Sequence, residues 1–184
     1  FSSATSVSGD HNNTGGKELV AFFAMPVAAG APTLVQYAGI NMTAVEDRAV
    51  SNNVRAHIQK LSGALGGTNG FVAQYTGPSG GIAVAANWPN SRGILQSTGG
   101  TQTANTSGSL ATTGATVLGS KIYMIFCGEN LDSFTETSGA TLIHSESAFD
   151  VARLYEKDGT GAVVTFSWTI GLAPRDMAFA LVEI

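Results

Sequence analysis

Hydrophobic residues in this chain occur in short runs, in which apolar and polar positions alternate at the period of a β-strand. Thr33–Tyr37 and Ile40–Val45 are two such runs, and Gly39 stands between them as an expected bulge. Gly, Pro, Asn or Asp bounds most runs, and no segment carries a convincing amphipathic helical pattern. The pattern predicts about ten short strands and an all-β fold, either a sandwich or a barrel.

The expected strands are spread over most of the chain. For Val54–Leu61 a strand is favoured, although one helical turn is an alternative. The other expected strands are Glu18–Met25, Thr33–Tyr37, Ile40–Val45, Phe71–Tyr75, Gly81–Trp88, Lys121–Cys127, Ala140–Ile143, Val151–Glu156, Val163–Trp168 and Met177–Ile184.

Two polar stretches suggest how the chain is divided. Residues 1–16 are rich in turn formers and are interpreted as an N-terminal arm or lead-in. Residues 89–118 are dominated by Gly, Ser, Thr and Gln and are interpreted as a polar linker with room for one or two extended segments. We therefore expect one β-sandwich domain over residues 17–184, because a single domain commonly has about 100–200 residues.

The regions on either side of this linker, residues 17–88 and 119–184, resemble each other. The same kinds of segment recur in the same order, which favours a true repeat over a chance likeness of short strands. The matched segments are Leu19–Ala24 with Ile122–Cys127, Gly30–Val35 with Gly139–Ile143, Gly67–Tyr75 with Gly159–Trp168, and Ile82–Trp88 with Met177–Ile184. Two similar four-strand halves predict an antiparallel sandwich of the jelly-roll type.

The order of segments also resembles a known kind of domain. An apolar opening strand is followed by Thr33–Thr43, a strand with charged faces and a Gly-Thr turn, and the chain closes on Val163–Trp168 and Ala178–Ile184. This order is similar to the jelly-roll domain of accessory proteins in tailed phages and gene transfer agents, which occurs in capsid decorations, head spikes and tail fibres. Some secreted bacterial surface proteins share it. The resemblance covers most of residues 17–184 and implies a structural role, with no fixed catalytic set.

Composition narrows the range of partners. Charged residues make up 12% of the 184 residues and the net charge is −4. Without a basic stripe, nucleic acid is not an expected partner. No apolar run reaches the roughly 20 residues of a membrane-spanning helix, so membrane insertion is not expected. Cys127 is the single cysteine and lies in an apolar run, which predicts a buried, inert thiol.

The motifs that would indicate catalysis or metal binding are missing or incomplete. Gly77–Gly81 resembles the nucleophile loop of chymotrypsin-like proteases, but His57 lies too close to it in sequence and lacks the family's surroundings. A hairpin turn explains the string. The three histidines are scattered, which argues against zinc, and the oxygen-rich segments Asp10–Asn13 and Glu129–Asp132 are interpreted as solvated turns rather than calcium ligands. We therefore expect no enzyme activity, no metal and no cofactor.

Aromatic residues are the remaining candidates for binding. Trp88, Tyr37 and Tyr155 fall in or at the ends of expected strands, where an aromatic face can stack on a sugar or anchor a protein interface. Core packing is the alternative for each of them, and it is the preferred interpretation of Trp168.

Together these patterns indicate a structural or assembly protein on the surface of a phage-like particle. Its expected partners are other virion subunits, such as capsid or tail proteins, further copies of itself in a homo-oligomer, and host glycans. The alternative is a carbohydrate-binding module of a secreted or cell-surface protein, which would place the chain outside the cell. A hydrolase is the least favoured hypothesis, because no acid–base pair or triad can be assembled from the sequence.

Overall fold

The computed structural model describes most of the chain: residues 4–14, 17–26, 30–50, 54–79, 82–88, 90–128, 134–146, 151–171 and 175–184. Within these residues the chain forms 16 β-strands and no helix. Every strand pair there is antiparallel. The predicted all-β antiparallel sandwich is confirmed.

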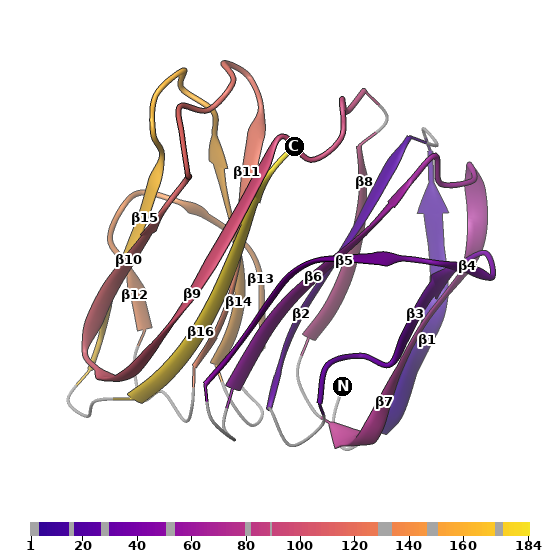
Figure 1. The fold of residues 1–184 in the computed structure, drawn as a ribbon, viewed down its shortest axis with the longest axis horizontal. Coiled ribbons are helices and arrows are strands. Elements are labelled where there is room, and N and C mark those ends of the chain that lie inside the picture. Colours follow the sequence, from indigo (N-terminus) through magenta and orange to yellow (C-terminus); the bar gives the residue numbers. More distant parts are fainter. Residues whose placement is uncertain are drawn as a thin grey trace.

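The strands form four sheets that lie in four layers (Figure 1). We call the first two layers the N-terminal unit, which spans residues 4–88. Its outer sheet has the order β1 (Ala4–Asn13), β7 (Gly67–Ser79), β3 (Leu34–Tyr37) and β4 (Ile40–Asn41). Its inner sheet has the order β5 (Thr43–Val50), β6 (Val54–Ser62), β2 (Glu18–Pro26) and β8 (Ile82–Trp88).

The other two layers form the C-terminal unit, which spans residues 96–184. Its inner sheet has the order β13 (Thr141–Glu146), β14 (Val151–Asp158), β11 (Lys121–Gly128), β16 (Arg175–Glu183) and β9 (Gln96–Asn105). Its outer sheet has the order β10 (Ser107–Ala111), β15 (Thr165–Ile170) and β12 (Phe134–Glu136). The two inner sheets pack against each other at the centre of the molecule.

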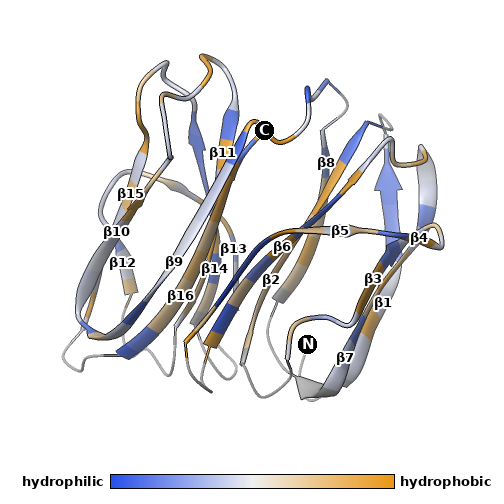
Figure 2. Cartoon of the chain, in the orientation of Figure 1, coloured by the Kyte–Doolittle hydropathy of each residue, from blue (hydrophilic) through white to orange (hydrophobic). Residues whose placement is uncertain are grey.

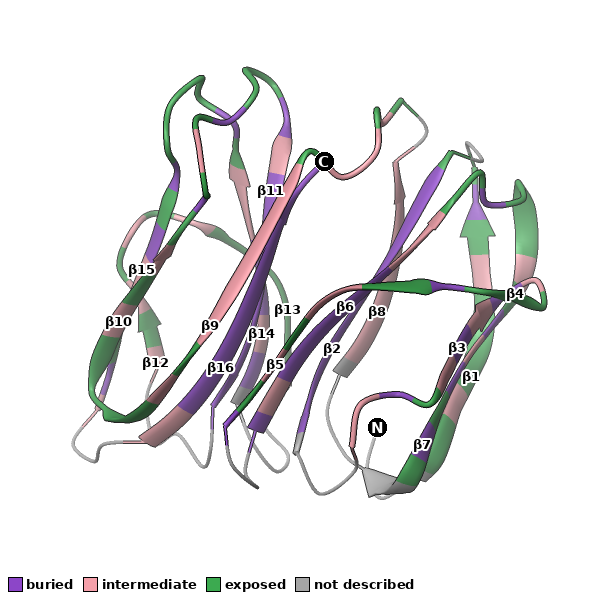
Figure 3. Cartoon of the chain, viewed as in Figure 1, coloured by how far each residue is buried: buried purple, intermediate pink, exposed green. Residues whose placement is uncertain are grey.

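Three hydrophobic cores fill the spaces between the four layers. One lies inside the N-terminal unit, one between the two inner sheets and one inside the C-terminal unit. Strand β2 belongs to two of them, because Phe22 faces the central core while Phe23 faces the core of its own unit. The central strands of the inner sheets, such as β2, β11 and β16, are therefore buried on both faces (Figure 3). This explains why Leu19–Met25 and Ile122–Cys127 are continuous apolar runs rather than alternating ones (Figure 2).

The two units share one topology. Strands β1, β2, β3, β5, β6, β7 and β8 occupy the same places in the N-terminal unit as β10, β11, β12, β13, β14, β15 and β16 in the C-terminal unit. Three of the four predicted matches join equivalent strands. The fourth is wrong, because Gly30–Val35 leads into β3 while Gly139–Ile143 leads into β13, whose counterpart is β5.

Several predicted boundaries are also wrong. Ala4–Asn13 is strand β1 rather than an irregular arm, since it pairs with β7 along its length. Residues 89–118 hold two extended segments, as the prediction allowed, but these strands, β9 and β10, belong to the C-terminal unit and do not form a linker. Each unit therefore holds eight strands in two sheets, and not a four-strand half. A jelly-roll arrangement stays a prediction.

Candidate functional site

Two of the three predicted binding residues lie in hydrophobic cores. Tyr37 is fully buried in the core of the N-terminal unit, and its hydroxyl donates to the carbonyl of Gly67 (3.0 Å) and accepts from Asn69 Nδ2 (3.1 Å). Tyr155 is 4% exposed, stacks on the ring of Phe134 with centroids 5.9 Å apart, and has a pKa raised by burial. Neither ring has a face open to a ligand.

Trp88 is placed differently. It is half-buried at the end of β8, and its ring centroid lies 4.9 Å from that of Tyr123 on β11. Its indole Nε1 donates to the Tyr123 hydroxyl at 3.3 Å. Trp88 therefore links the inner sheets of the two units at one end of the molecule, and it is the predicted residue that borders an open hollow.

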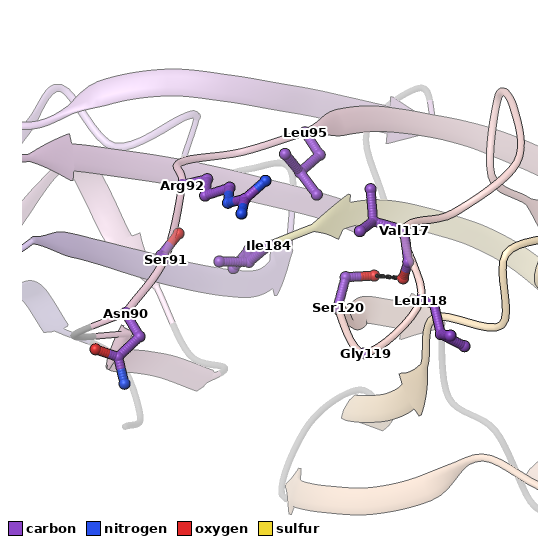
Figure 4. Close-up of a pocket in the computed structure, with 9 residues that line it drawn as sticks. All are labelled: Asn90, Ser91, Arg92, Leu95, Val117, Leu118, Gly119, Ser120 and Ile184. Carbon is purple, nitrogen blue, oxygen red and sulfur yellow. Dashed lines mark hydrogen bonds between the residues drawn. The ribbon is translucent and has the colours of Figure 1, made fainter.

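Two adjoining hollows occupy this end of the inner sheets, and we call them together the junction groove. They have volumes of about 310 and 260 Å³ and share Asn90, Ser91, Gly119 and Ile184. The larger one is completed by Arg92, Leu95, Val117, Leu118 and Ser120 (Figure 4). The smaller one is completed by Trp88 and Lys121. The chain segment that joins the two units thus forms one wall of the groove, and the loop before β11 forms the other.

Exposed apolar side chains line the larger hollow. Leu95 is 41% exposed, Val117 52% and Leu118 80%, and Figure 4 shows Leu118 pointing out from its loop. Three of the eight exposed large hydrophobic side chains among the described residues therefore gather around this one hollow. A cluster of this kind typically marks a site of protein contact.

Two positively charged side chains line the groove, and they differ in whether they form ion pairs. Lys121 Nζ lies 2.6 Å from both Glu156 Oε1 and Asp158 Oδ1, and these two hydrogen bonds raise the pKa of Lys121. Arg92 is exposed and has no ion-pair partner among the residues that the structure describes. Arg92 is therefore the positive charge that is available to a carboxylate or a carbonyl on a partner.

A buried carboxylate holds the loop that carries Val117 and Leu118. Glu183, on β16, is 1% exposed, and its Oε1 accepts hydrogen bonds from Val117 N and Ser120 Oγ at 2.5 Å each. Gln96 Nε2 donates to its Oε2, also at 2.5 Å. Three donors compensate for burying this charge, and they fix the loop relative to β9 and β16.

Buried hydroxyl groups hold the rest of the same loop. Thr116 Oγ1 donates to the carbonyl of Ala162 and accepts from the backbone N–H of Thr160. Thr112 Oγ1 accepts from the N–H of Val164 in the same way. Residues 112–120 are low in complexity, yet they are tied to a fixed geometry. The rim of the groove is thus preorganised, which lowers the entropy cost of binding a partner.

Nothing in the described geometry assembles a catalytic centre. His57 is 3% exposed, with Nδ1 3.3 Å from Asp47 Oδ1 and Nε2 2.9 Å from the side-chain amide of Gln59. A buried imidazole in contact with an amide is not placed to activate a nucleophile. Ser79 lies at the end of β7, but its side chain and residues 80 and 81 are outside the described residues.

The described residues contain no group of three His, Cys, Asp or Glu side chains that could hold a metal ion. The calcium candidate at residues 129–132 lies outside them, and in Asp10–Asn13 the Asn13 side chain is buried and donates to backbone carbonyls of Ala64 and Leu65. Cys127 is buried, as predicted. Its thiol lies 3.8 Å from the carbonyl of Met25.

Comparisons with protein-family models, curated proteins and solved structures find no match for this chain. In the part of the chain that the structure describes, no helix is long and apolar enough to cross a membrane. Function must therefore be inferred from the residues of the groove and from the fold.

The sequence pointed to Trp88 but not to the aliphatic rim of the groove. Leu95, Val117 and Leu118 belong to two short apolar pairs, Ile94–Leu95 and Val117–Leu118, in a polar stretch, so no periodicity marks them. They meet because residues 90–95 leave the N-terminal unit where the loop 112–120 enters β11. Short apolar pairs in low-complexity sequence are the one available signal, and it is a weak one.

Proposed function

We propose that this chain is a non-enzymatic structural subunit of a phage-like particle. It docks on the shell or tail through the junction groove and acts as a homo-oligomer on the particle surface. The observation that carries the proposal is the exposed aliphatic rim, in which Val117 and Leu118 lie on a loop held by Glu183 and Leu95 lies on the segment that joins the units. The particle itself is suggested by the resemblance of the segment order to accessory virion proteins.

The groove indicates the chemistry of the partner surface. An aliphatic or aromatic side chain of a shell or tail subunit would fill the hollow beside Leu95 and Val117, with a partner carboxylate on Arg92. A single groove of this size buries too little surface for tight binding. Repetition on a symmetric lattice supplies the missing strength, because many weak contacts act together in a multivalent assembly.

The test is docking of the purified protein onto native particles that have been stripped of it. Leu118→Asp places a charge on the rim without touching a core, so we expect a stable fold and a loss of particle binding of at least tenfold. Leu65→Asp is the matched control, because Leu65 is 52% exposed and belongs to the N-terminal unit. Equal binding by both variants would contradict docking through this groove.

Carbohydrate binding is a second candidate, favoured by the smaller hollow. Trp88 offers a half-exposed indole there, and Asn90, Ser91 and Lys121 place amide, hydroxyl and ammonium groups around it. Aromatic rings flanked by hydrogen-bonding groups are typical of sugar sites. On this hypothesis the protein is extracellular, is retained on a polysaccharide column and loses retention as Trp88→Ala but not as Leu118→Asp.

A further inference from the structure

The two units differ at one edge of their inner sheets. In the C-terminal unit, β16 pairs with β11 on one side and with β9 on the other. In the N-terminal unit, the equivalent strand β8 pairs with β2, and no described strand lies on its other side. The fold therefore accepts an antiparallel strand at this position, and in the N-terminal unit none of the described strands occupies it.

Strand β8 lacks the features that protect free sheet edges. Proteins usually block such edges with charged side chains, proline, bulges or very short strands. Ile82–Trp88 has seven residues, of which none is charged, Pro or Gly, and it pairs with β2 without a bulge. The other three edge strands of the inner sheets are less suited to pairing. Strand β5 carries Glu46, Asp47 and Arg48, and β9 contains two adjacent glycines. Strand β13 has a bulge between Leu142 and His144 and ends on Glu146.

We propose that β8 pairs with β8 of a second copy of this chain, antiparallel about a two-fold axis at Ala85. The register is self-complementary: Ala85 lies opposite itself, Val84 opposite Ala86, Ala83 opposite Asn87 and Ile82 opposite Trp88. No charges meet across the pair. The four-stranded inner sheet of the N-terminal unit in one copy would then join the same sheet of the second copy, which gives one continuous sheet of eight strands.

The side chains of β8 lie on the two faces of its sheet, and the proposed pairing would use only the hydrogen-bonding edge of the strand. Ala83 and Ala85 border a hollow of about 190 Å³ between β8 and β1. On the opposite face of the strand, Val84 and Trp88 pack on the central core. This contact between two copies of the chain would serve the proposed assembly role, and it rests on that role only for its biological purpose. The β8 edge and the rim at Leu118 are separate surfaces.

The test compares charge variants at the axis. Wild-type protein is expected to show a concentration-dependent mass that rises to two chains in sedimentation equilibrium. Ala85→Glu and Ala85→Lys each place like charges opposite each other in the pair, so each variant alone stays monomeric, whereas an equimolar mixture of the two forms a heterodimer. Far-ultraviolet circular dichroism and urea unfolding check that both variants are folded.

Cross-linking tests the register. Ala85→Cys is expected to form an interchain disulfide on mild oxidation, whereas Ala83→Cys is not, because the two positions 83 lie several residues apart along the pair. The native Cys127 is buried and gives no background. A wild-type protein that is monomeric at every concentration, or dimers that persist in both charge variants, would overturn the proposal. Leu118→Asp should leave the dimer intact, so failure of groove docking is distinguishable from failure of β8 pairing.

Discussion

At the scale of single residues, Glu183 shows how a polar sequence makes a rigid surface. Its carboxylate is buried without a cation and accepts hydrogen bonds from Val117 N, Ser120 Oγ and Gln96 Nε2. A buried charge is tolerated when its lone pairs are satisfied in this way. The exposed rim of the groove thus owes its shape to a residue that no partner would touch.

Replacement of Glu183 should therefore destabilise the protein strongly. Glu183→Ala leaves three donors without their acceptor, and we expect the free energy of unfolding to fall by about 2–4 kcal/mol. Ser120→Ala removes one of the three interactions and should cost about 1 kcal/mol. Urea unfolding at neutral pH measures both, and a Glu183→Ala variant no less stable than Ser120→Ala would contradict this role.

At the same scale, Asp47 makes a pH-dependent contribution to the free energy of unfolding. Burial raises the pKa of its carboxyl, but hydrogen bonds and charges from His57 and Arg55 outweigh burial and hold the pKa below its usual range. The ionised form therefore stabilises the fold above the ordinary Asp pKa of about 4, and this contribution is lost as the pH falls through the lowered value.

Asp47→Asn should remove this part of the acid dependence. We expect the variant to be less stable than wild type near pH 7 and the difference to shrink as the pH falls through the lowered pKa of Asp47, toward pH 2. The effect is modest, because the Asp47 side chain is 42% exposed and solvent screens its ion pairs. Urea midpoints at the two pH values measure it, and a difference that is constant with pH would contradict the assignment.

At the scale of elements, the packing of strand β9 requires two glycines, each of which lies against different neighbouring atoms. A Cβ on Gly99 would lie 2.6 Å from Arg48 Cγ and 2.8 Å from the Phe179 carbonyl oxygen. A Cβ on Gly100 would lie 2.6 Å from Cε2 of the Phe179 ring. Close packing on both faces thus requires glycine in this strand, although the sequence around it looks like a flexible linker.

Substitution of these glycines should separate packing from backbone effects. Gly99→Ala and Gly100→Ala are each expected to lower stability by about 1–3 kcal/mol through overpacking. Gly70→Ala, in strand β7, is the control, because a Cβ there meets nothing within 4 Å. Thermal unfolding followed by circular dichroism compares the three, and equal midpoints would show that β9 is not packed as described.

The elements also show what a sequence pattern can and cannot predict. Strands β2 and β11 were predictable because burial on both faces requires continuous apolar runs. Strands β1, β9 and β10 were not, because Ser, Thr, Gly and Asn carry no periodicity and these strands are set by pairing with β7, β16 and β15. The same limit explains why only part of the candidate site could be predicted. Trp88 was recognisable as an aromatic residue at a strand end, whereas the aliphatic rim depends on two loops that meet only in the folded chain.

At the scale of the whole molecule, two equivalent eight-stranded units are joined face to face through their inner sheets. The central core joins the two units, and a chain of this length can bury enough apolar surface for such a core. The stacking leaves the sheet ends, the sheet edges and the outward faces of the two outer sheets as surfaces available for contact. The junction groove is at one such end, and β8 is one such edge.

The most direct test of the assembly role is sedimentation of the protein's native source material through a density gradient, with quantification of this chain in each fraction. We predict that the chain migrates with a very large particle at a fixed ratio to the main shell or tail subunit. Recovery of the chain only as free protein, at no fixed ratio to any particle, would contradict the assembly role and favour glycan binding at Trp88.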